Sequence, residues 1–123
     1  MNTILAESNN FLITNIFETT YLIKKHQCNS KNRIIIGTFY GDPQTAIIDK
    51  EEKWCAIAGE GLIIYFLRDP FSSYKENQVS SQFFSKYKNE SNIKWIQQLV
   101  QLSANQILIT DDNHQKSIFN IKL

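Results

Sequence analysis

Few side chains in this sequence could carry out chemistry, and they are scattered along it. There are two histidines, His26 and His114, and two cysteines, Cys28 and Cys55. A nucleophilic cysteine or serine needs a base beside it, and a metal site needs several ligands that converge. No nucleophile elbow, phosphate-binding glycine loop or paired-cysteine spacing occurs in the sequence. We therefore expect no catalytic residue, no enzymatic activity and no cofactor.

The densest group of potential ligands is Asp111, Asp112 and His114. Two carboxylates and an imidazole could hold a divalent ion, although most of its ligands would have to come from elsewhere. Aspartate and asparagine also favour hairpin turns, because their side chains hydrogen-bond to the nearby backbone. We expect a turn at this point and no bound metal.

The charge and hydropathy of the sequence argue against nucleic acid and membranes as binding partners. The 13 basic and 12 acidic residues give a net charge of +1, without the basic excess typical of nucleic-acid or membrane-surface binding. The first residues lack the pattern of a signal peptide. The longest apolar run, residues 62–67, is far shorter than the roughly 20 residues of a membrane span. We expect a cytoplasmic chain with reduced cysteines and neither nucleic acid nor membrane as a partner.

Length and composition then point to the elements that must position any site. A chain of 123 residues predicts a single domain, residues 1–123. It contains 18 isoleucines and five alanines, a bias that favours strands over helices.

The middle of the chain predicts an antiparallel meander. Turn signals such as Gly41-Asp42-Pro43 and Gly59-Glu60-Gly61 separate short runs rich in branched and aromatic residues. Their spacing of about ten residues is typical of consecutive hairpins. The strands expected here are residues 33–40, 44–49, 53–58 and 62–67.

The sequence on either side of this middle region also predicts antiparallel strands. We expect a mainly β fold whose antiparallel meanders form a twisted sheet, a half-barrel or a half-propeller-like unit. Residues 93–102 fit both a helical stripe and one face of a strand, and the strand-like context favours a strand. A short helix within residues 78–88 or 93–102 is the alternative. Further strands are expected at residues 10–17, 20–26, 106–110 and 117–123, and buried side chains at Trp54, Ile57, Ile63, Tyr65, Phe66 and Trp95.

Acidic residues gather in the predicted turns. If these turns lay on one edge, they would form an acidic surface for a basic partner, with exposed aromatic side chains as anchors. The alternative is that they are solvated hairpin tips. The candidate partner-binding residues are Asp49, Glu51, Glu52, Glu60, Asp111 and Asp112, with Tyr74 and Tyr87 as the aromatic anchors.

Residues 42–74 carry a family resemblance. Their pattern DPQTAIIDKEEKWCAIAGEGLIIYFLRDPFSSY, followed later by Lys94-Trp95-Ile96 and Gln101, resembles the small immunity proteins of bacterial contact-dependent growth inhibition systems. The hairpin rhythm is also similar to that of β-propeller blades. The first resemblance implies a cytoplasmic antitoxin, monomeric when free, that occludes the active site of one cognate toxin domain, often a nuclease. Immunity surfaces vary with the toxin, so the resemblance carries over no binding residues.

The leading hypothesis is therefore an immunity protein that binds and neutralises a toxin. An interaction or scaffold domain of another purpose would share the same small size, balanced charge and lack of catalytic motifs. A small enzyme is the third hypothesis, because β folds support many chemistries without leaving a motif.

Overall fold

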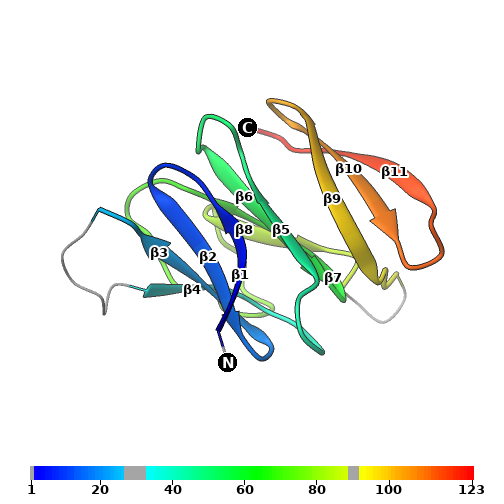
Figure 1. Ribbon diagram of the computed structural model, residues 1–123, viewed down its shortest axis with the longest axis horizontal. Coiled ribbons are helices and arrows are strands. Elements are labelled where there is room, and N and C mark those ends of the chain that lie inside the picture. The colour runs from blue at the N-terminus through cyan, green and yellow to red at the C-terminus, as the bar shows by residue number, and fades with distance from the viewer. Residues whose placement is uncertain (1, 27–32, 89–91) are drawn as a thin grey trace.

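Three antiparallel sheets stacked face to face form this protein (Figure 1). The computed structural model describes residues 2–26, 33–88 and 92–123, and within them the structure is all β, with 11 strands and no helix. Cys28 lies outside the described residues. The strands are β1 (Asn2–Glu7), β2 (Phe11–Ile16), β3 (Thr19–Lys24), β4 (Arg33–Thr38), β5 (Thr45–Ile48), β6 (Trp54–Gly59), β7 (Gly61–Phe66), β8 (Phe83–Lys86), β9 (Ile96–Ser103), β10 (Gln106–Asp111) and β11 (Lys116–Asn120).

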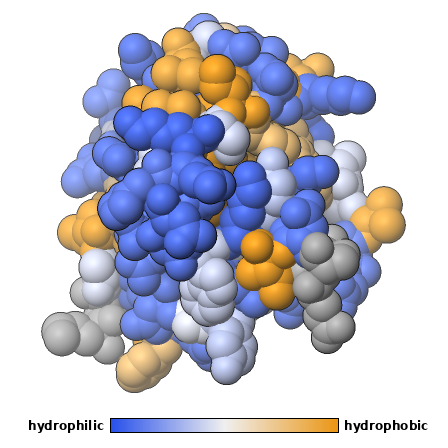
Figure 2. Space-filling model, turned by 90° about the vertical axis from the view of Figure 1, so that its right-hand side faces the viewer, coloured by the Kyte–Doolittle hydropathy of each residue, from blue (hydrophilic) through white to orange (hydrophobic). Residues whose placement is uncertain are grey.

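Each sheet is a meander in which sequence neighbours are also spatial neighbours. The first sheet has the order β1-β2-β3-β4, the second β5-β6-β7-β8, and the third β9-β10-β11. The side of the molecule that carries the third sheet faces the viewer in Figure 2 and is mostly hydrophilic, with smaller hydrophobic areas. The first strands of the three sheets lie side by side, β1 against β5 and β5 against β9 (Figure 1). The expected mainly β fold of antiparallel meanders is therefore confirmed.

The middle sheet is buried on both faces, which explains its unbroken apolar sequence. One face carries Ile57 and Ile63 against Ile13 of the first sheet. The other carries Trp54 and Ile64 against the third sheet. A strand covered on both sides has no solvent face for polar residues, so β6 and β7 lose the usual alternation.

A tight turn at Gly61 fixes the register between these two central strands. Gly59 lies opposite Gly61, and Gly61 has a φ of +91°. A Cβ atom there would overlap the side chain of Lys88 and approach its Cα to 3.1 Å. Only glycine combines this backbone conformation with so little space.

The strand predicted over residues 93–102 is present as β9, and a β-bulge explains its helix-like pattern. Ile96 pairs with Asp111 and Gln98 with Thr110, so Gln97 is an extra residue. The bulge turns Ile96 and Leu99 toward the same core although they are three positions apart.

One sequence prediction is wrong, one alternative is ruled out, and one strand was not foreseen. The short helix given as an alternative within residues 78–88 is absent, because β8 (Phe83–Lys86) pairs with β7 there. The burial predicted for Trp95 is wrong: it precedes β9 and is 45% exposed. β1 was not expected, since its run NTILAE has only two large apolar residues. Burial of Trp54, Ile57, Ile63 and Tyr65 is confirmed, and Phe66 is half-buried.

Candidate functional site

The turns at the top of the stack in Figure 1 are joined to one another by hydrogen bonds. The Glu52 carboxylate accepts hydrogen bonds from the Ser8 hydroxyl and from the Asn10 amide side chain, the latter at 2.6 Å. The buried Asp49 carboxylate accepts from the Lys53 backbone N–H at 3.0 Å and from Gln101 at 2.8 Å. These bonds tie the β5–β6 turn to the β1–β2 turn and to β9. We call this region the interlocked end, residues 8–10, 49–53 and 101–105.

The chemistry of Glu52 matches a structural role. The hydrogen bond from Ser8 is the main cause that lowers the pKa of Glu52, and bonds from Asn10 add to it. Donors that point at the ionised form favour that form. Glu52 and Asp49 were predicted to bind a partner, but their carboxylates already hold the fold together.

Exposed aromatic side chains lie at the opposite end of the strands. Tyr40, after β4, is 73% exposed, and Trp95 is 45% exposed. Their ring centroids are 6.4 Å apart in an edge-on arrangement. Phe17, in the β2–β3 turn, is 69% exposed with a φ of +52°. Large rings held in water by turns are unusual on a monomer surface and typical of interface anchors.

Acidic residues lie in the same turns as these rings. The Glu18 carboxylate accepts a hydrogen bond from the Gly41 N–H at 2.6 Å, and Glu60 forms an isolated backbone β-bridge with Trp95. The Asp112 N–H donates to the Trp95 carbonyl oxygen at 2.9 Å. We call this region the acidic aromatic end. Its residues are Phe17, Glu18, Tyr40, Asp42, Glu60, Trp95, Asp111 and Asp112.

Two lysines at this end, Lys88 and Lys94, are at least partly covered. The Lys88 side chain is only 7% exposed, and its ammonium lies 4.0 Å from Glu60 and 3.8 Å from Glu76. Desolvation lowers the pKa of Lys88, while the two carboxylates oppose that shift. Lys94 places its ammonium 4.5 Å from the centre of the Tyr87 ring. Glu18, Asp42 and Asp112 are exposed at this end, against the exposed Lys116, which pairs with Thr110 beside the Asp111 turn.

The predicted partner-binding residues thus fall into separate places. Glu60, Asp111 and Asp112 belong to the acidic aromatic end, whereas Asp49, Glu51 and Glu52 lie at the interlocked end, at the other end of β10. The acidic turns, which would have formed one surface on a shared edge, are therefore divided into two groups.

The two aromatic residues predicted as exposed anchors, Tyr74 and Tyr87, are buried or half-buried. Tyr74 is only 6% exposed and packs at a tilt against Phe83 in the core, so it offers no anchor. Tyr87 is half-buried against the second core. Sequence reasoning missed Phe17, Glu18, Tyr40, Asp42 and Trp95. One sequence signal could have indicated the exposure of Tyr40. This residue directly precedes the turn Gly41-Asp42-Pro43, and turns lie at the surface.

The Asp111 turn has the hairpin geometry expected of it. The Asp111 carboxylate accepts hydrogen bonds from the backbone N–H groups of Asn113 and Gln115, each at 2.9 Å. His114 has a φ of +63° at the tip. Over residues 2–26, 33–88 and 92–123, no group of three or more His, Cys, Asp or Glu residues is placed to hold a metal ion.

The comparisons with known proteins identify no relative. Neither a family model, nor a curated protein, nor a solved structure matches this chain. In the described part of the chain there is also no helix long and apolar enough to cross a bilayer.

Proposed function

We propose that this protein is a non-catalytic binding domain that holds a basic protein partner on its acidic aromatic end. The observation that carries the proposal is the exposed Tyr40–Trp95 pair, at an end whose turns also carry the exposed acidic residues Glu18, Asp42 and Asp112. Aromatic side chains supply most of the binding energy in many interfaces, and surrounding charges select the partner and speed its approach.

The sequence resemblance favours a more specific role, that of a cytoplasmic immunity protein. A nuclease toxin binds a polyanion, so its substrate cleft is basic. An acidic surface with aromatic anchors would enter that cleft in place of the phosphates and block access to the active site. The inhibitor needs no catalytic group, which agrees with the roles of Asp49, Glu52 and Asp111 as hydrogen-bond acceptors within the fold.

Co-purification with the product of the adjacent gene tests this role. The expected result is a one-to-one complex and survival of cells that express both proteins, with loss of both effects in the variant Tyr40→Ala/Trp95→Ala. Binding without protection would leave an interaction or scaffold domain of another purpose. A complex unaffected by this double substitution would place the interface elsewhere and contradict the proposal.

A further inference from the structure

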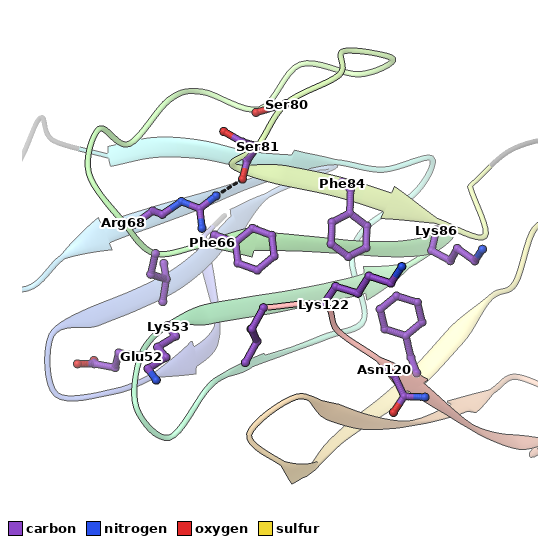
Figure 3. Close-up of a pocket in the computed structure, with 13 residues that line it drawn as sticks. Glu52, Lys53, Phe66, Arg68, Ser80, Ser81, Phe84, Lys86, Asn120 and Lys122 are labelled. Carbon is purple, nitrogen blue, oxygen red and sulfur yellow. Dashed lines mark hydrogen bonds between the residues drawn. The ribbon is translucent and has the colours of Figure 1, made fainter.

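A groove runs along the outer rim of the molecule between the second and third sheets. It has a volume of about 880 Å³. Its floor is a row of half-buried rings, Phe66, Phe84 and Phe119, with successive centroids 6.1 Å apart. Figure 3 shows the rings of Phe66 and Phe84 directed into the groove from β7 and β8. The groove shares no residue with the acidic aromatic end.

Basic side chains border this aromatic floor. Lys53, Arg68, Lys86 and Lys122 line the groove, against the single side-chain carboxylate of Glu52. Arg68 donates a hydrogen bond to the Ser81 carbonyl oxygen (Figure 3). Among the described residues, neither the Lys86 nor the Lys122 ammonium lies within 4.0 Å of a carboxylate. The groove therefore combines an apolar floor with positive charge at its borders.

The groove lies beside an open strand edge. The first and second sheets each have four strands, whereas the third has three and ends at β11. Phe84 of β8 and Phe119 of β11 line the same groove, so the groove borders the empty position where a fourth strand would follow β11. In the described chain, β11 pairs on one side only, with β10.

The register shows which backbone groups are unpaired along that edge. The Ile121 N–H donates to Asn105 on the β10 side at 2.8 Å. Backbone N–H groups alternate in direction along a strand, so the N–H groups of Ser117 and Phe119 also face β10. Those of Ile118 and Asn120 face outward, toward the empty position. An exposed edge of this kind is a template for an added strand.

We propose that this edge accepts an extended segment of a partner protein as a fourth strand of the third sheet. The added strand would bond to β11 through its backbone and would place alternate side chains over Phe84 and Phe119. Because the borders carry Lys86 and Lys122, the segment has apolar residues at its centre and acidic residues toward its ends. This surface is independent of the acidic aromatic end, so the protein holds two binding surfaces of opposite charge.

The test uses a capped synthetic peptide in which glutamate, valine, isoleucine and glutamate alternate with threonines. Binding is followed by calorimetry, and backbone pairing by amide hydrogen exchange of the Ile118 and Asn120 N–H groups. We expect saturable binding that protects both amides from exchange. The same peptide with lysine in place of glutamate should bind about tenfold more weakly or less, a difference of about 1.4 kcal/mol.

Two variants of the protein separate strand addition from simple occupancy of the groove. Ile118→Pro removes an outward N–H without touching the β10 ladder, and should weaken peptide binding about tenfold. Lys86→Glu/Lys122→Glu should also weaken peptide binding about tenfold, because it reverses the charge at the borders of the groove. Both lysines are exposed, so the variant should keep the fold. Lys50→Glu/Lys75→Glu, with the same charge change outside the groove, should bind like the parent.

Three outcomes would overturn the proposal. One is the absence of peptide binding, and another is binding without protection of the Ile118 and Asn120 amides. The third is binding of laurate, a small amphipathic anion, to the groove while the peptide fails to bind. That result would make the groove a small-molecule site and not a strand-docking edge.

Discussion

At the scale of single residues, the carboxylates divide into those that hold the fold and those that face solvent. Glu52 is bonded to Ser8 and Asn10 across two sheets, while Glu51 beside it is exposed and only 3.9 Å from Lys53. The sequence offers no means of telling such neighbours apart, because the partners of Glu52 lie 42 and 44 positions away. Composition and turn signals therefore predicted the acidic turns but not their roles.

The first prediction concerns the pH dependence of Glu52. Because its pKa is lowered in the folded state, its contribution is complete above the unfolded-state pKa and is lost as the pH falls through the folded-state value. Glu52→Gln should reduce the free energy of unfolding by about 1 kcal/mol at neutral pH. The difference from the parent should vanish well below about pH 4. Urea unfolding at several pH values measures this.

Glu51→Gln is the matched control for that measurement. Its carboxylate is exposed, so the substitution should leave the free energy of unfolding nearly unchanged at every pH. An equal loss of stability in both variants would show that the hydrogen bonds of Glu52 do not contribute as described.

The second prediction concerns the solvent-facing carboxylates at the acidic aromatic end. Asp42→Lys/Asp112→Lys should slow association with a basic partner by about tenfold and weaken its dependence on salt, because electrostatic steering acts on the association rate. Surface plasmon resonance over a range of salt concentrations measures both effects. Glu51→Lys reverses a charge at the interlocked end and should leave the association rate near that of the parent. A similar fall in both variants would mean that only net charge matters.

At the scale of elements, strands and turns were far easier to predict than the faces of the strands. Residues 53–58 and 62–67 lie between clear turn signals, so β6 and β7 were expected nearly at their observed bounds. The bulge at Gln97 could not be foreseen, because it depends on the pairing of β9 with β10. The bulge gave the apolar residues of the strand a helix-like spacing. The exposure of Trp95, just before the strand, was not predicted either.

The third prediction compares two turn glycines with similar backbones and different surroundings. Gly41 and Gly61 have φ values of +81° and +91°, but a Cβ atom at Gly41 would meet nothing within 4 Å. Gly41→Ala should therefore lower the free energy of unfolding by about 1 kcal/mol, through backbone strain alone. Gly61→Ala should lower it by about 3 kcal/mol, because Lys88 must also move. Equal losses in urea unfolding would contradict the close packing at Gly61.

At the scale of the whole molecule, two hydrophobic cores share the middle sheet. The first core contains Cys55, Ile63 and Tyr65, and the second contains Trp54 and Ile64, so adjacent residues of β6 and β7 serve different cores. The same burial raises the pKa of the Cys55 thiol far above its ordinary range and leaves it unreactive. Unfolding of either core must disrupt the strands that support the other.

The fourth prediction follows from this shared sheet. Ile63→Ala, in the first core, should lower the free energy of unfolding by about 3 kcal/mol. In a Trp95→Phe background, the fluorescence of Trp54 reports the second core. Its urea transition should shift by the same amount as the transition seen by circular dichroism. Two separate transitions would show that the cores unfold independently.

The hydrogen bonds of the interlocked end also bear on which positions of the chain can change during evolution. A substitution at Asp49 or Glu52 breaks contacts between sheets, so it harms the fold before it alters any partner. A substitution at Tyr40 or Asp42 changes an exposed loop and leaves the two cores intact. If the proposed surface binds the partner, new partner preferences can arise by exchanging a few loop side chains on an unchanged frame, as in the variable loops of antibodies.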